Sequence, residues 1–329
     1  MKMKKILFVL LFSLFSFSVF AEENIENSNV KTDIGFIDAI ILGLVEGVTE
    51  FLPISSTGHL ILADNFLGLD SDIPLKNSQG EFIIDKRASK KAGETVFFTM
   101  KNAADSYAVI IQIGAIAAVA LIYWKTLLEM ALGFLGKSRN GLMIARNLIL
   151  AFLPAAVFGF LFHDLIGKFL FGIYPVVFAL FAGALLMFYA QKKYKKFQDE
   201  KLDLHELSSK QSLLIGLCQC VALWPGTSRS MMAILGGYAV GLSPVRAAKF
   251  SFLLGFITLS AASVYKMLKD GSTMVQALSV TPLLVGLVIA FVSAAISVKW
   301  LVGFLTTHGL TPFAWYRILL CAVILLLNV

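Results

Sequence analysis

Six apolar runs of about 17 or more residues recur along this chain, and each is long enough to cross the hydrocarbon core of a bilayer as an α-helix. Of the 329 residues, 58% are hydrophobic and 15% are charged, whereas a soluble domain has about a quarter of its residues charged. A transmembrane β-barrel would show short segments of alternating hydrophobicity instead. The sequence therefore predicts an all-α polytopic membrane protein with six transmembrane helices, at residues 106–124, 147–165, 174–190, 247–265, 281–298 and 312–328.

The first 21 residues have the layout of a secretory signal peptide. Three lysines within the first five residues precede an apolar run, and Val19-Phe20-Ala21 is a small-residue cleavage site ahead of a polar segment, residues 22–34. The alternative is an uncleaved first membrane helix. Residues 1–21 are left out of the predicted fold in either case, and cleavage would place the mature N-terminus outside the cytoplasm.

Loop charge predicts how the spans are oriented. The most basic loop, residues 191–210, contains the run QKKYKK and is expected in the cytoplasm, because cytoplasmic loops carry an excess of Lys and Arg. Residues 63–105 then form an extracytoplasmic loop, and only Lys266 and Lys269 fall on the wrong side. The net charge of +7 is attributed to this orientation. No nucleic acid is expected as a partner, and a homo-oligomer is left open.

Two further apolar segments, residues 35–62 and 211–240, are interrupted by polar residues, glycine and proline. They resemble each other, because GLVEG in the first pairs with GLCQC in the second, and FLPISS pairs with WPGTS after a one-residue shift. Each segment is followed by three predicted spans. Since three is an odd number, the second copy is upside down relative to the first.

The prediction is thus an inverted-topology repeat made of residues 35–190 and 211–329. Such repeats bring discontinuous helices together near the bilayer midplane. Each broken segment is expected to be a re-entrant helix–loop–helix, the first entering from outside and the second from the cytoplasm. Non-helical backbone at that depth must be buried in protein or line a cavity.

The first broken segment concentrates polar side chains. Glu46 and Glu50 are four residues apart, so both carboxylates project from one face of a helix. Pro53 is expected to end that helix. Ser55, Ser56 and Thr57 suit the N-terminus of the next helix, whose free N–H groups attract anions, and His59 shares the face of Ser56.

The second broken segment repeats this layout with a cation. Pro225-Gly226 breaks the helix, and Thr227, Ser228, Arg229 and Ser230 open the next one. The Arg229 guanidinium matches phosphate oxygens, and the nearby carboxylates suit either a divalent cation or acid–base chemistry. The alternatives are a structural ion pair for Glu46, Glu50 and Arg229, and simple helix capping for the hydroxyl residues.

These residues resemble the bacterial undecaprenyl-diphosphatase family, also called the bacitracin-resistance protein family. EGVTEFLPISSTGHLIL is similar to its first motif and PGTSRS to its second, and VIIQIGAIAAVALIYW and PFAWYRILL are similar to other family segments. The resemblance covers the chain from about residue 35 to the C-terminus. Departures are Ala233 and Lys249, where the family usually has threonine and often glutamate, and the absence of a proline from residues 256–258.

The resemblance implies an enzyme of the bacterial inner membrane whose site opens to the periplasm. It would hydrolyse undecaprenyl diphosphate to the monophosphate carrier of peptidoglycan synthesis and confer bacitracin resistance. It implies a divalent cation, Mg²⁺ or Ca²⁺, held by Glu46 and Glu50. Arg229 would clamp phosphate with the hydroxyl residues as substrate-binding groups, and Ser56 or His59 would be the nucleophile or base.

Two questions stay open from the sequence. The nucleophile could be Ser56, His59 or water. Inverted repeats with broken helices are also typical of transporters, so a flippase of undecaprenyl phosphate or another anionic substrate is the rival function.

Near the C-terminus, Trp315 and Tyr316 are expected to be interfacial or packing aromatics, and Arg317 to snorkel or anchor at the membrane surface.

Overall fold

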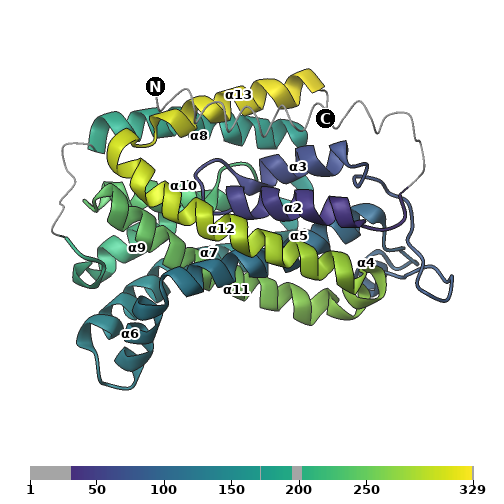
Figure 1. The fold of residues 1–329 in the computed structure, drawn as a ribbon, viewed down its shortest axis with the longest axis horizontal. Helices are drawn as coiled ribbons and strands as arrows, with labels where there is room; N and C mark the ends of the chain where they lie inside the picture. Colours follow the sequence, from purple (N-terminus) through teal and green to yellow (C-terminus); the bar gives the residue numbers. More distant parts are fainter. Residues whose placement is uncertain (1–30, 171, 195–201, 328–329) are drawn as a thin grey trace.

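The computed structural model describes residues 31–170, 172–194 and 202–327, and these residues are mainly helical (Figure 1). The predicted signal peptide lies outside the described residues, as does part of the basic loop 191–210. The helices, in chain order, are α2 Phe36–Thr49, α3 Ser56–Phe66, α4 Lys86–Ala92, α5 Met100–Ile122, α6 Trp124–Phe134, α7 Arg139–Phe169, α8 Ile173–Tyr194, α9 Ser209–Cys220, α10 Arg229–Ala239, α11 Pro244–Ala277, α12 Val280–His308 and α13 Thr311–Leu327, with short 3₁₀ helices η1 Leu204–Glu206 and η2 Val221–Leu223.

The prediction of an all-α polytopic membrane protein is confirmed. Five helices in the described residues are long and apolar enough to cross a membrane, namely α5, the first 24 residues of α7, α8, α11 and α12. The sixth predicted span corresponds to α13, an apolar helix of 17 residues at the lower end of the spanning range. Large apolar side chains such as Phe160, Leu161 and Ile296 are exposed on the outside, as lipid-facing residues are.

The loop predicted at residues 63–105 is shorter in the structure, because α3 continues to Phe66 and α5 already begins at Met100. The early start of α5 has a local cause. The Thr99 hydroxyl accepts a hydrogen bond from the Asn102 N–H, and the Asn102 side chain accepts one from the Thr99 N–H. This reciprocal cap starts the helix several residues before its apolar stretch.

The two halves of the chain are interlocked. From the second half, α12 packs along α2 and α5 of the first, and α13 lies along α8, while α7 of the first half packs against α9 (Figure 1). Gly47 on α2 leaves no room for a side chain, because a Cβ there would overlap the backbone of α12 at Ala290. Both hydrophobic clusters of the interior therefore contain residues from the two halves.

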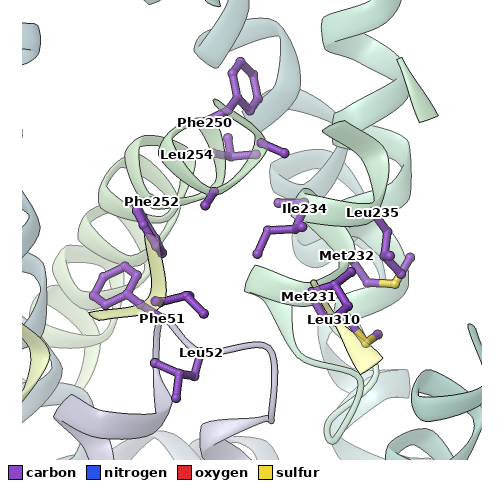
Figure 2. Packing of buried hydrophobic residues seen from close by; sticks show 14 of the residues in the cluster. Phe51, Leu52, Met231, Met232, Ile234, Leu235, Phe250, Phe252, Leu254 and Leu310 are labelled. Atoms are coloured by element: carbon purple, nitrogen blue, oxygen red, sulfur yellow. The ribbon is translucent and has the colours of Figure 1, made fainter. Parts of the chain in front are cut away.

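Both predicted broken segments are helix–break–helix units. In the first, α2 ends at Thr49 and α3 begins at Ser56; in the second, α9 and η2 are followed by a turn and then α10. Figure 2 shows Phe51 and Leu52 of the first break packed among the side chains of α10 and α11. Phe51 meets Phe252 of α11 edge to face, with ring centroids 5.8 Å apart. Burial of the breaks in protein satisfies the requirement for irregular backbone at membrane depth.

Candidate active site

The returning helices α3 and α10 begin in the same unusual way. Their N-cap residues, Ser55 and Ser228, have φ values of 74° and 76°, and no other residues except glycines have positive φ in the described part of the chain. Each serine hydroxyl accepts a hydrogen bond from the N–H three residues later. A left-handed, non-glycine residue is strained and tends to occur at functional sites. Ser55 and Ser228 are separated by the same number of residues as Gly43 and Gly216, so the matching strain aligns the two broken segments without the one-residue shift expected from the sequence.

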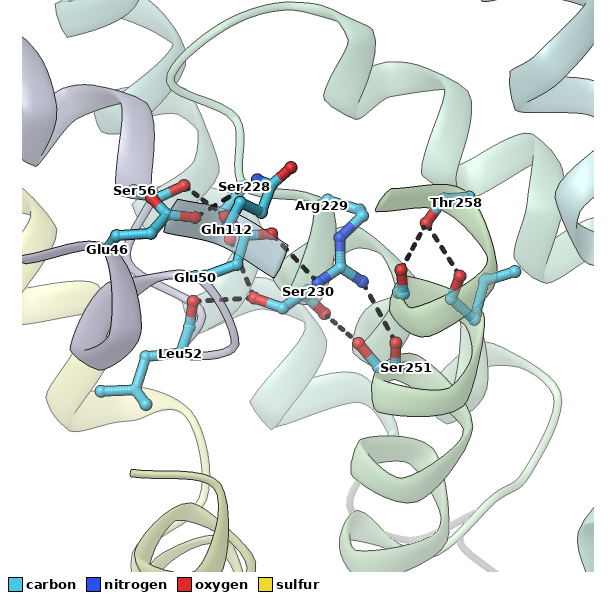
Figure 3. A network of polar contacts seen from close by, with 12 residues as sticks. Glu46, Glu50, Leu52, Ser56, Gln112, Ser228, Arg229, Ser230, Ser251 and Thr258 are labelled. Atoms are coloured by element: carbon cyan, nitrogen blue, oxygen red, sulfur yellow. Dashed lines mark hydrogen bonds and ion pairs between the residues drawn. The ribbon is translucent and has the colours of Figure 1, made fainter. Parts of the chain in front are cut away.

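Glu50 joins the two breaks. Its Oε2 accepts a hydrogen bond of 2.6 Å from the Ser56 hydroxyl, and its Oε1 lies 3.3 Å from Arg229 Nη2 (Figure 3). The Glu50 side chain is almost completely buried, as is most of the Arg229 side chain. Serine, carboxylate and guanidinium thus form one chain of contacts, with residues from both halves of the protein. The strong Ser56–Glu50 bond places a proton acceptor on the hydroxyl.

Arg229 is hydrogen-bonded at both Nη atoms but not at Nε, among the residues that the structure describes. Its Nη1 donates to the Ser251 carbonyl of α11 at 3.1 Å, and its guanidinium lies over the Phe51 ring, 5.5 Å from the centroid. The Arg229 Nε is buried and has no hydrogen-bond partner within the described residues. A buried donor without a partner is costly. An anionic group brought to the guanidinium would supply the missing acceptor.

Glu46 occupies the floor of a cavity. It is 1% exposed, and its Oε1 accepts a hydrogen bond of 3.3 Å from Gln112 of α5. The cavity has a volume of about 700 Å³ and is lined near its floor by Glu46, Ser56, Thr57 and Gln112. Such a volume is within the range of small-molecule sites.

The outer part of the same cavity is charged. Asp64, Asp70 and Asp105 line it together with a single lysine, Lys101, which pairs with Asp70 at 2.6 Å. Apolar residues of α3 and α5 and the turn between α7 and α8 complete the wall. The cavity therefore connects the Ser56 hydroxyl with the end of the protein at which the predicted extracytoplasmic loop lies.

His59 is not placed to act as the general base for Ser56, because both of its ring nitrogens already have hydrogen-bond partners. Its Nδ1 lies 2.7 Å from the Ser55 carbonyl, and its Nε2 lies 2.7 Å from the Tyr316 hydroxyl of α13. The carbonyl can only accept, so Nδ1 carries a proton and Nε2 accepts from Tyr316 in the neutral ring. Both ring nitrogens are thereby occupied. Like Glu50 and Arg229, His59 lies behind the residues that line the cavity.

The predicted substrate-binding hydroxyls divide into two groups. Thr57 lines the cavity, whereas the Ser230 hydroxyl donates to the Leu52 carbonyl at 2.7 Å and lies 3.1 Å from the Ser228 hydroxyl. Ser230 therefore links the second break to the first. Ser55 and Ser228 are N-caps, and Thr227 is buried with its carbonyl accepting from Arg317.

The expectation that Arg317 snorkels or anchors at the membrane surface is wrong. Arg317 is completely buried and donates all its hydrogen bonds to main-chain carbonyls inside the protein. Tyr316 is also buried, whereas Trp315 is exposed. An apolar helix gives no sign of which of three neighbouring residues faces inward, and only the packing of α13 against α8 decides it.

Sequence reasoning also missed Gln112 and the Ser251 carbonyl. Gln112 is a polar side chain inside the apolar run VIIQIG, and such a residue in a membrane helix is itself a signal of function. The Ser251 carbonyl carries no sequence signal, because any residue at that position would present the same oxygen.

Glu46 is the carboxylate at the floor of the cavity that is available to bind a divalent cation. No group of three or more His, Cys, Asp or Glu residues that could hold a metal ion occurs within the described ranges. Both oxygens of Glu50 are engaged, by Ser56 and Arg229. Glu46 faces the cavity, and hard cations such as Mg²⁺ are commonly bound by one or two carboxylates plus substrate phosphates and water. The donor set is therefore compatible with an ion that arrives with, or is completed by, a phosphate ligand.

Comparison with known proteins identifies the family. A family model described as bacitracin resistance protein BacA matches residues 39–323. The chain is 38% identical over 292 residues to an undecaprenyl-diphosphatase of Sorangium cellulosum, covering 88% of this chain and 85% of that protein. It is 36% identical over 293 residues to one of Clostridium tetani (89% and 96%) and 39% identical over 289 residues to undecaprenyl-diphosphatase 1 of Chromobacterium violaceum (87% and 94%). The chain therefore belongs to the bacitracin resistance protein BacA family.

Proposed function

We propose that this protein hydrolyses undecaprenyl diphosphate to undecaprenyl phosphate and inorganic phosphate. The observation that carries the proposal is the contact chain Ser56–Glu50–Arg229 beside a 700 Å³ cavity. Relatives covering nearly the whole chain are named undecaprenyl-diphosphatase. We place the protein in the bacterial inner membrane with the cavity open to the periplasm, as the loop charges predict.

The reaction proceeds by attack of the Ser56 hydroxyl on the terminal phosphorus. Glu50 accepts the Ser56 proton as the Oγ–P bond forms, the anhydride P–O bond breaks, and the lipid monophosphate leaves. Water then attacks the serine phosphate, and Ser56 recovers its proton as inorganic phosphate is released. Arg229 neutralises charge on the phosphate oxygens, since phosphoryl transfer depends mainly on positioning and electrostatic stabilisation.

A divalent cation, Mg²⁺ or Ca²⁺, would be held by Glu46 beside Gln112. When bound, it supplies positive charge to the diphosphate oxygens. Glu50 would not share the ion, because its two oxygens remain bound to Ser56 and Arg229. Glu46 would then hold the ion without a second protein carboxylate. This assignment narrows the sequence-based expectation, in which both carboxylates hold the ion, to a proposal in which Glu46 is the main ligand.

Removal of divalent cations is expected to stop phosphate release by the purified protein. Excess EDTA should lower the rate at least about 10²-fold, and either Mg²⁺ or Ca²⁺ should restore it, because several kcal/mol of charge stabilisation depend on the ion. The measurement is inorganic phosphate released from undecaprenyl diphosphate in detergent. Unchanged release after exhaustive chelation would overturn the metal assignment and leave the serine mechanism standing.

The rival function is transport of a lipid phosphate, favoured by the two helix breaks with matching serine caps and by their predicted inverted arrangement. We test the two with one preparation. Phosphate release that is lost in both Glu50→Ala and Arg229→Ala supports the enzyme. Movement of a fluorescent undecaprenyl phosphate across reconstituted vesicles, with no phosphate release from the diphosphate, supports the transporter and contradicts the proposal.

A further inference from the structure

Arg317 of α13 uses all five of its N–H donors on main-chain carbonyls. Nε donates to Leu180 and Nη2 to Ala179, both of α8, at 3.1 Å each. Nη2 also donates to Gly226 at 2.9 Å, and Nη1 donates to Thr227 at 3.2 Å and Pro53 at 3.5 Å. No carboxylate pairs with it among the residues the structure covers. A guanidinium has five donors, so its hydrogen-bonding capacity is complete.

Three of the five carbonyls that Arg317 binds lie shortly before the reactive groups in the sequence. Pro53 precedes Ser55 and Ser56 in the first break, and Gly226 and Thr227 precede Ser228 and Arg229 in the second. One guanidinium therefore ties both helix breaks to each other and to α8. Ser56 and Arg229 come from opposite halves of the chain, and their separation depends on how the two breaks are held.

Stability alone does not explain a buried cation of this kind. Burial of an unpaired charge is costly, and a well-packed apolar side chain of similar volume is often as stable or more so. A forked donor does supply something an apolar residue lacks, namely fixed directions to several acceptors at once. We propose that Arg317 is a positioning residue that sets the distance between Ser56 and Arg229 by clamping the carbonyls that precede them.

Gly183 of α8 makes room for this clamp. A Cβ at Gly183 would overlap Arg317 Nη2 and lie 3.0 Å from Cζ. Gly183→Ala therefore displaces the guanidinium while leaving Arg317 in the chain. Because alanine favours a helix more than glycine does, the substitution does not weaken α8 itself.

The test compares two variants that disturb the clamp, Arg317→Lys and Gly183→Ala, with Leu320→Ala as the matched control. Leu320 lies one turn later on α13 and is likewise completely buried. Its apolar side chain cannot donate a hydrogen bond to either helix break. For each variant, kcat and KM for phosphate release from undecaprenyl diphosphate are measured beside the melting midpoint in the same detergent, at a temperature where the variant is folded.

Both clamp variants should lose about 10²-fold in kcat, with a rise in KM at least ten times smaller than that loss, because a displacement of about 1 Å costs catalysis on that scale. Leu320→Ala should lower the melting midpoint but keep kcat within about threefold, since it removes packing and not orientation. If Arg317→Lys does not fold, Gly183→Ala decides alone.

The inference rests on the proposed function, and the two can fail separately. A wild-type protein that releases no phosphate contradicts the proposed function. A wild-type protein that does, together with folded Gly183→Ala at near wild-type kcat, overturns only the positioning role. Loss of kcat in Leu320→Ala in proportion to its melting midpoint would also overturn it.

Discussion

Ser56→Ala and Glu50→Gln should each lower phosphate release about 10³-fold, and the double variant should be no slower than the worse single one. The Ser56 hydroxyl donates to Glu50 Oε2 at 2.6 Å, so the proposed nucleophile and base should act as one unit. General-base assistance contributes about 10² to 10⁴-fold, and residues that act as a unit are strongly non-additive. The measurement is kcat for each of the four proteins under saturating substrate.

A direct trap identifies the nucleophile. Rapid quenching with diphosphate labelled on its terminal phosphate should place the label on Ser56 in the wild type and nowhere in Ser56→Ala. Ser272→Ala, an exposed position on α11, is the control and should retain full activity. Label on His59 instead, or water oxygen entering phosphate with no labelled protein at any time, would contradict the serine mechanism. In the kinetic comparison, a loss in the Ser56→Ala, Glu50→Gln double variant equal to the product of the two single losses would show that Ser56 and Glu50 act separately.

The architecture could be predicted because the bilayer imposes strong rules on sequence. Apolar runs of spanning length and basic loops are visible without any tertiary information. The two broken segments were recognisable because charged and hydroxyl residues beside proline are costly at membrane depth unless they serve a site. The structure adds the shared backbone strain at Ser55 and Ser228 and brings Ser56, Glu50 and Arg229 into contact.

Pairwise contacts across the fold could not be predicted in the same way. Glu46 and Glu50 look equivalent on one helix face, yet Glu50 is bound to Ser56 and Arg229 while Glu46 faces the cavity with Gln112. His59 looks available as a base until the Tyr316 hydroxyl is found on it. Arg317 acts through carbonyl oxygens at Pro53 and Gly226, and main-chain oxygens leave no trace in a sequence.

Gly255→Ala should abolish most of the activity although the substitution replaces no charged residue. A Cβ at Gly255 of α11 would lie 2.6 Å from Arg229 Cζ and 2.7 Å from Nη2, and would overlap Nη1. The Arg229 guanidinium cannot make a small adjustment away from the added methyl group, because the Phe51 ring and the Ser251 carbonyl confine it. We expect Arg229 to leave Glu50 and the phosphate position, with a loss in kcat of about 10² to 10³-fold, the scale of one missing electrostatic stabiliser.

Gly271→Ala is the matched control, because Gly271 is on the same helix and a Cβ there would meet nothing within 4 Å. Both substitutions add one methyl group and raise the helix propensity of α11 by the same amount. Any difference between them must therefore come from the space beside Arg229. Gly255→Ala should approach the activity of Arg229→Ala, and combining the two should cause little further loss. Near wild-type kcat in Gly255→Ala would contradict the assignment of Arg229, in its present position, as the phosphate clamp.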